Sequence, residues 1–290
     1  TTTDTLSLHD ALPISLPLFL EGFVHLLRVE PDQEQARTLY RKLRKSPLYD
    51  RKLKMYKVNA DLSGESEEIG RTRIFPPGWL ENESIWLHME YKYCLELLRN
   101  GLYDEFYETF RDILIPFQNP DQYGRSYLEN SSFIVSSAHP DESLHGQGFV
   151  ARLSGSTAEF IQMWLWMCAG RQPFYVDENR ELNLALKPIL PAWLFNPEAA
   201  AKEYGPPGRR QLETIPAGGF AFNLRGHTLT VYHNPKMKST FGADPAVIRD
   251  MTLQYYGRKG FVEIAGPVIP APYAEDVRDH KIRRIDVFLD

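Results

Sequence analysis

Residues 75–88 read FPPGWLENESIWLH, and this stretch carries the strongest expectation for the fold. Its Pro-Pro-Gly triplet shapes a loop, and the apolar spacing that follows predicts a helix over 84–99. Glu81 and Asn82 stand at the expected helix entrance, and His88 lies about two turns in. A carboxylate placed there can accept sugar hydroxyls, and a histidine can donate to an anion. The alternative interpretation is a helix cap at Asn82 or Glu81 and a histidine buried in the core.

The loop over residues 136–148 is rich in titratable groups and reads SSAHPDESLHGQG. Its glycines suggest a backbone that passes close to another part of the chain. His139, Asp141 and His145 are side chains of the kind that ligate metals. Their spacing across a loop that contains proline is not diagnostic, so we predict no metal site.

Residues 153–157 read LSGST and open an apolar segment that we expect to be a buried helix. The first amides of a helix lack partners within the helix and lie at the positive end of its dipole. A start built from small, hydroxyl-bearing residues leaves these amides open to an anion such as phosphate. Ordinary capping by Ser154 or Ser156 is the alternative.

Two regimes follow one another along the chain, so the predicted class is mainly α, then β. Helical spacing predicts helices at 18–27, 32–45, 84–99, 103–117 and 157–168. Pro31 and Asp32 form the start signal of the second helix. Strand-like runs bounded by Gly, Pro and Asn lie at 182–186, 219–224, 228–232, 251–255, 261–264 and 282–289. The long loops at 52–79 and 119–153 are expected to be functional.

Composition excludes several classes of function. The 290 residues are 43% apolar and 24% charged, which favours a folded protein with a sizeable core. A net charge of −5 gives no electrostatic footprint for nucleic acid or an anionic membrane. Only Cys94 and Cys168 are present, and no apolar run is long enough for a membrane span. We therefore expect a cytoplasmic protein.

The first residues of the chain call for a separate interpretation. Residues 5–14, TLSLHDALPI, match the translation of a common sequencing adapter. Residues 1–15 are therefore expected to be a scar without structure, and the true protein to start near Leu16. The alternative is a weak signal peptide, but the stretch lacks a basic start and a proper apolar core.

Four segments together resemble glycoside hydrolase family 94, the cellobiose and chitobiose phosphorylases. Residues 76–88 match the family's loop before a long helix, and residues 146–158, GQGFVARLSGSTA, match its later Thr-Gly motif. Residues 184–193 and 225–235 match a proline-rich strand and a strand pair further on. The resemblance covers about residues 52–235.

The resemblance implies a fold and a reaction. It implies the C-terminal part of an (α/α)6 barrel over residues 16–172 and a β-sandwich over 173–290. The reaction would be an inverting phosphorolysis of a β-linked gluco-oligosaccharide, with inorganic phosphate as co-substrate and no other cofactor. The general acid, an Asp, is expected upstream, so no catalytic residue is assigned in this chain, which alone should be inactive. The full-length protein is expected to be able to form a homodimer.

The resemblance also implies roles for particular residues. Phosphate would be held by His88, Ser154 and Gly155, where Ser154 replaces a threonine. The acceptor sugar would be bound by Glu81, with Phe75 and Trp79 beside it.

Departures from the family's pattern keep two alternatives open. Glu83 and Ser84 replace two glycines, and Phe75 and Leu80 replace a tyrosine and a lysine that serve the acceptor. A simple glucose acceptor is therefore not expected. One alternative is a phosphate-independent glycosidase or transglycosylase, and the other is a non-catalytic carbohydrate-binding or scaffolding protein.

Overall fold

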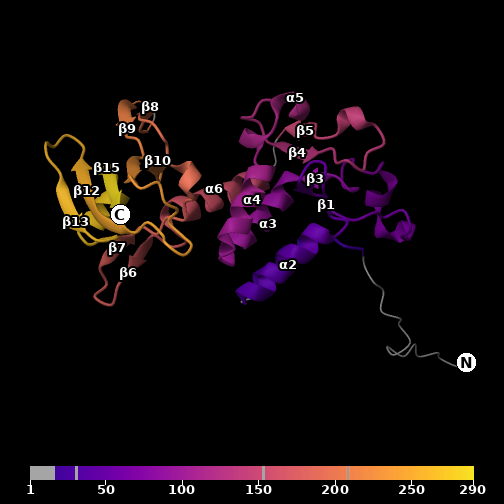
Figure 1. Cartoon of the computed structure of the whole chain (residues 1–290), viewed down its shortest axis with the longest axis horizontal. Helices are drawn as coiled ribbons and strands as arrows, with labels where there is room; N and C mark the ends of the chain where they lie inside the picture. The colour runs from indigo at the N-terminus through magenta and orange to yellow at the C-terminus, as the bar shows by residue number, and fades with distance from the viewer. Residues whose placement is uncertain (1–16, 30–31, 152–153, 207, 209) are drawn as a thin grey trace, which may run out of the picture. The chain divides into compact units, whose positions relative to one another are not determined.

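The computed structural model describes residues 17–29, 32–151, 154–206, 208 and 210–290. The scar predicted at residues 1–15 lies outside this part of the chain. The chain divides into two compact units, residues 1–160 and 161–290, and helix α6 (Ser154–Ala169) runs across the division (Figure 1).

The helices of the first unit pack around one central helix, α3. In chain order they are α1 (Leu20–Val29), α2 (Gln33–Lys45), α3 (Leu87–Arg99), α4 (Tyr103–Ile113) and the single turn α5 (Pro120–Tyr123). Helix α3 contacts α1 and α4, and most of its side chains are buried. Asp32 caps α2, because its side chain accepts hydrogen bonds from the N–H groups of Glu34 at 2.7 Å and Gln35 at 3.3 Å. The predicted start of this helix is confirmed.

A buried ion pair ties α1 to α3. The Glu96 side chain is completely buried, and Arg28 donates to its Oε1 through Nε at 3.0 Å and Nη2 at 2.8 Å. The Arg99 guanidinium lies 2.9 Å from the other carboxylate oxygen. A buried carboxylate needs such partners, because leaving it unpaired costs several kcal/mol. The crossing of these two helices is therefore fixed by charge as well as by apolar packing.

Two small antiparallel sheets and several single turns complete the first unit. Strands β1 (Tyr49–Asp50) and β2 (Met55–Tyr56) form one sheet, and β3 (Ile85–Trp86), β4 (Ser131–Ile134) and β5 (Gly148–Ala151) form the other. The 3-10 turns are η1 (Glu67–Ile69), η2 (Arg71–Ile74), η3 (Ile115–Phe117) and η4 (Glu142–Leu144). In the three-stranded sheet, Trp86 pairs with Phe133 and Phe133 pairs with Phe149, so aromatic side chains share one face.

A five-stranded sheet forms the core of the second unit, in the order β10-β11-β15-β12-β13. Its strands are β10 (Gly219–Leu224), β11 (Thr228–His233), β12 (Ile248–Tyr255), β13 (Val262–Ala265) and β15 (Ile282–Leu289). Strands β11 and β15 are parallel, and the other neighbours are antiparallel. The buried hydroxyl of Tyr232 donates to the carbonyl of Cys168 at 2.6 Å, which fixes the end of α6 to this sheet.

Smaller elements accompany this sheet. Strands β6 (Phe174–Val176), β7 (Leu182–Ala185) and β14 (Val268–Ile269) form a three-stranded sheet, in the order β14-β7-β6. Strands β8 (Ala200–Tyr204) and β9 (Gln211–Ile215) form a hairpin. The turn η5 (Ala192–Leu194) and the short helix α7 (Tyr273–Arg278) complete the unit.

The (α/α)6 barrel predicted over residues 16–172 is wrong. Such a barrel consists of helical hairpins throughout, whereas the described stretches 46–86 and 114–151 hold short strands, 3-10 turns, loops and one helical turn. The expected helix over 84–99 begins only at Leu87, because the two residues before it pair with β4 as a strand. The helix expected over 103–117 ends at Ile113, shortly before Pro116, which cannot continue it.

The β-sandwich predicted over residues 173–290 needs correction as well. The strands of this region divide among a five-stranded mixed sheet, a three-stranded sheet and a two-stranded hairpin. Alternation and turn signals locate strands along the chain, but they do not say which strands pair. The parallel pairing of β11 with β15, which lie more than fifty residues apart, has no local signal.

Candidate functional site

Two of the segments singled out in the sequence meet in the first unit. Gly78 has a φ of +77°, and a Cβ atom built there would lie 2.6 Å from the backbone nitrogen of His139. The N–H of Ser136 donates to the carbonyl of Gly78 at 3.3 Å. Only glycine fits this close approach. The Pro-Pro-Gly loop therefore lies directly on the turn at residues 136–139.

An aromatic cluster fixes this loop against the small sheet. The half-buried Trp79 ring meets Phe133 and Phe149 edge to face, with centroids 5.2 and 4.7 Å away. The Trp86 ring stacks on Phe133 at 5.9 Å. Edge-to-face pairs of this kind stabilise a fixed geometry. Trp79, expected to bind substrate, is thus engaged with other rings.

Polar contacts clamp the loop from inside. The Asn82 side chain donates to the carbonyl of Phe75 at 2.7 Å, so it closes the loop and does not cap a helix. The carbonyl of Leu80 accepts from Trp86 Nε1 at 2.8 Å and also from the hydroxyl of Ser84. The half-exposed Phe75 therefore contributes its backbone to the site's architecture.

Glu83 occupies a backbone position that suits glycine. Its φ is +54°, in the left-handed region that glycine adopts at least cost. Its carboxylate lies 2.6 Å from Lys57 Nζ, and its N–H donates to Asn59 Oδ1 at 2.6 Å. These contacts hold the residue in its strained conformation. The family pattern has glycine at this position.

Glu81 has one carboxylate oxygen without a hydrogen-bond partner among the described residues. Its Oε1 is 2.5 Å from Arg71 Nη2, whereas its buried Oε2 has no hydrogen-bond partner among the described residues. Arg71 begins turn η2, and the residues around that turn line a cleft of about 460 Å³. The lining residues are Glu67, Gly70, Arg73 and Ile74. Glu81 is not among these lining residues, but its carboxylate can accept a further hydrogen bond at the buried Oε2.

His88 is the second residue of helix α3 and is half-buried. Its ring meets the Trp86 ring edge to face, with centroids 5.6 Å apart. Burial lowers the pKa of His88, Lys92 lowers it further, and Glu21 opposes them. The imidazole is therefore neutral at pH 7. Its buried Nδ1 has no hydrogen-bond partner in the described part of the chain. Lys92 Nζ lies 3.6 Å from the Glu21 carboxylate, and the two charges act on the imidazole in opposite directions.

The histidines of the loop at 136–148 are used structurally. Lys52 Nζ donates to His145 Nδ1 at 2.8 Å, and His145 Nε2 donates to the carbonyl of His139 at 2.7 Å. His139 Nδ1 accepts from the N–H of Asp141 at 3.1 Å. Within the described residues, no three His, Cys, Asp or Glu side chains are grouped to hold a metal ion.

The buried carboxylates of Asp50 and Glu90 in this unit were not predicted from the sequence. Asp50, only 3% exposed, accepts the N–H of Ser137 at 2.6 Å and so anchors the loop at 136–148. Glu90 on α3 is fully buried and accepts the N–H of Tyr56. The signal for Glu90 is its position between Leu87 and Cys94, on an otherwise apolar helical stripe.

The other half of the predicted phosphate clamp is only partly described. Helix α6 begins at Ser154, directly before Gly155, and Gly148 begins β5 in contact with Tyr123. Residues 152–153 and the Ser154 side chain lie outside what the structure describes. The pairing of His88 with Ser154 and Gly155 therefore stays a prediction.

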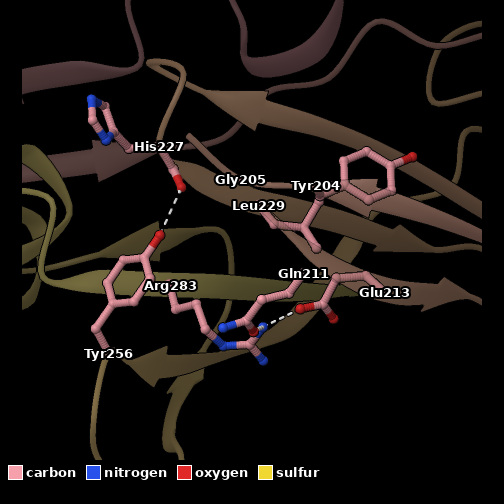
Figure 2. A pocket seen from close by; sticks show the side chains of 8 residues that line it. All are labelled: Tyr204, Gly205, Gln211, Glu213, His227, Leu229, Tyr256 and Arg283. Carbon is pink, nitrogen blue, oxygen red and sulfur yellow. Dashed lines mark hydrogen bonds and ion pairs between the residues drawn. The ribbon is translucent and has the colours of Figure 1, made fainter. Parts of the chain in front are cut away.

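A separate small pocket in the second unit is filled by its own side chains (Figure 2). Arg283 reaches across it to Glu213 and to Gln211, and Tyr256 donates to the carbonyl of His227 at 3.3 Å. The remaining cavity is about 10 Å³, roughly the space of one water molecule. The side chains that fill this pocket join the β8–β9 hairpin to the sheet and leave little room for a ligand.

No model of a protein family matches the chain, and no curated protein matches it. The resemblance to family 94 therefore depends on the four motif segments themselves. Within the described residues, none of the helices combines the length and apolar content that a bilayer crossing requires.

Proposed function

We propose that this chain supplies the phosphate and acceptor contacts of an inverting glycoside phosphorylase. The substrate is a β-linked gluco-oligosaccharide, and the product is an α-sugar 1-phosphate. An acid protonates the glycosidic oxygen, and a phosphate oxygen attacks the anomeric carbon from the opposite face, so the C–O bond to the leaving sugar breaks as the new C–O bond forms. No residue of this chain is assigned as the acid.

The observation that carries the proposal is the state of His88. A half-buried, neutral imidazole with an unpartnered nitrogen can bind an anion without first breaking an internal ion pair. Lys92 adds positive charge nearby. Helix α6 starts at Ser154, and the first amides of a helix have no partner within the helix itself, as at known phosphate-binding helix starts.

Glu81 supports the acceptor side of the proposal. Its buried Oε2 has no hydrogen-bond partner among the described residues, and a sugar hydroxyl can supply one. Phe75 stays a proposed part of this subsite, and Trp79 supports the loop that carries Glu81. The proposal includes a cytoplasmic location, which agrees with Cys94 and Cys168 being unpaired and buried.

Titration with inorganic phosphate tests the proposal directly. We expect phosphate to bind the chain and to raise the pKa of His88, because an anion favours the imidazolium, as followed by NMR of the ring. His88→Ala should weaken binding about tenfold or more, since hydrogen bonds to charged groups are worth about 1.5–3 kcal/mol. His25→Ala is the matched control, because His25 is exposed and pairs only loosely with Glu21 at 3.9 Å.

Two results would contradict the proposal. One is equal phosphate affinity in wild type and His88→Ala. The other concerns a preparation that includes the catalytic acid: cleavage of the oligosaccharide at the same rate without phosphate would show a hydrolase or transglycosylase.

A further inference from the structure

Alternate side chains of β15 point to opposite faces of the five-stranded sheet, one apolar and one, which we call the polar face, with charged groups. Ile285, Val287 and Leu289 are buried on one side. Arg284 and Phe288 alternate with them on the other. The register places Leu229 and Val231 of β11 on this polar face on one side of β15, and Asp250, Thr252 and Gln254 of β12 on the other.

The β8–β9 hairpin covers one half of the polar face. Ile215 of the hairpin packs on Leu229 and Val231. Glu213 of the same hairpin accepts from Arg284 Nη1 at 2.8 Å and also pairs with Arg283. This half of the face is therefore closed by apolar contact and ion pairs.

The other half, over β12 and β13, is open. It forms a groove of about 640 Å³, within the range of small-ligand sites. The side chains that matter for recognition in this groove are Arg249, Asp250, Thr252, Phe261, Glu263 and Phe288. Asp250 pairs with Phe288 across the strands, and Thr252 pairs with Glu263, so these four share one face.

Phe288 is held as a fixed ring in this groove. The His233 imidazole stacks on it at 4.7 Å with the rings 19° apart. His233 is held in turn by Asp286, whose Oδ1 lies 2.7 Å from its Nε2. Phe261 is a second aromatic ring in the lining and is 61% exposed. The groove therefore contains the Phe288 ring, oriented by its neighbours, and the largely exposed Phe261 ring.

The chemistry of the groove selects its ligand. Aromatic rings pack against the C–H face of a pyranose, and carboxylate and hydroxyl groups accept or donate to its ring hydroxyls. Asp250 is paired with Arg249, so these two charges offset one another, and the remaining carboxylate of Glu263 favours a ligand without negative charge. An aliphatic ligand would leave these polar groups unsolvated. We propose that the groove between β12, β13 and Phe288 binds a neutral oligosaccharide. This site is separate from the phosphate-binding residues and does not depend on them.

Calorimetric titration of the full chain with cellotetraose, chitotetraose and maltotetraose, without phosphate, tests this site. We expect at least one tetrasaccharide to bind, and Phe288→Ala and Phe261→Ala each to weaken it about tenfold. Phe261 is so exposed that its replacement leaves the fold intact. Tyr175→Ala is the matched control, because Tyr175 is a partly exposed aromatic residue of β6 outside the groove.

Three outcomes would overturn the inference. The first is that none of the three tetrasaccharides binds. The second is that both phenylalanine variants bind like wild type. The third is that Glu81→Gln abolishes binding while the phenylalanine variants retain it, which would place the sugar at the candidate site of the first unit. The titration contains no phosphate, so its failure and a failure of phosphate binding in the separate phosphate titration are distinguishable.

Discussion

The two units treat buried polar groups in opposite ways. In the first unit, Thr72, Glu81, Asn82, His88 and Glu90 each keep a buried side-chain atom without a hydrogen-bond partner among the described residues. All five lie between turn η2 and the middle of α3. Leaving a buried polar atom unsatisfied costs about 1–3 kcal/mol. Atoms of this kind also occur outside that stretch, for example at Asn59 and Thr109, so a bound ligand would supply partners only to those at the candidate site.

In the second unit, the polar face of β15 satisfies itself. Asp286 accepts from both Arg284 and His233, and Arg284 reaches Glu213 as well. Burial opposes ionisation of Asp286, but the hydrogen bonds from His233 and Arg284 lower its pKa overall. Buried charge alone therefore does not mark a binding site. What marks one is a charge or donor whose partners are missing.

The largest expected effect comes from breaking the self-satisfied network. Asp286→Ala removes the buried carboxylate that accepts from both Arg284 and His233, so we expect the free energy of unfolding to fall by about 3–5 kcal/mol. Urea unfolding measures the loss, and hydrogen exchange of the β15 amides assigns it to this unit. Asp244→Ala is the control, because Asp244 forms an ion pair with Lys238 but is 80% exposed. Its replacement should lower the free energy of unfolding by under about 1 kcal/mol. Equal losses in the two variants would contradict the network's role.

A smaller effect is expected from the close approach in the first unit. Gly78→Ala forces a Cβ against the backbone of His139, whereas Gly124→Ala at a similar φ of +69° meets nothing within 4 Å. We expect about 1 kcal/mol of strain at Gly124 and about 2–4 kcal/mol at Gly78. Urea unfolding of the two variants isolates the contact, since the backbone strain is shared. Equal losses would show that the loop does not depend on the turn at 136–139.

Local signals predicted individual elements of the fold better than their assembly. The start of α2 follows from the short-range capping chemistry of Asp32, and β10 and β15 have the predicted bounds, 219–224 and 282–289. The helix expected from residue 84 starts later, because strand pairing across about fifty residues takes Ile85 and Trp86 into β3. Pairing at that distance leaves no periodic trace in the sequence.

The candidate site was predictable in part for the same reason. The Pro-Pro-Gly triplet predicts a turn, and the structure shows Gly78 in that turn. The sequence also drew attention to Glu81 and His88, both of which keep an unpartnered atom. It could not show that Asn82 closes the loop onto Phe75, or that Asp50 anchors Ser137 from another segment. Those contacts exist only after tertiary folding.

The smallest effect is expected from the buried carboxyl of Glu90, and it depends on pH. Burial raises the pKa of Glu90 well above 4.5, the Tyr56 N–H opposes this, and Asp50 and Asp112 add to it. The folded chain therefore keeps this proton when the unfolded chain has lost it. Its contribution to stability is full below about pH 4.5 and declines as pH rises toward the raised pKa. Near neutral pH this carboxyl therefore weakens the first unit.

Glu90→Gln removes that titration while keeping an acceptor for the Tyr56 N–H. We expect the variant to match wild type at about pH 4 and to exceed its free energy of unfolding by about 1 kcal/mol or more at about pH 8. The measurement is urea unfolding across this range. Glu34→Gln on α2 is the control, because Glu34 is 66% exposed, so its replacement should change the free energy of unfolding little. A difference between Glu90→Gln and wild type that stays constant with pH would mean that Glu90 is ionised in the folded chain, and then some group beyond its described contacts must stabilise the charge.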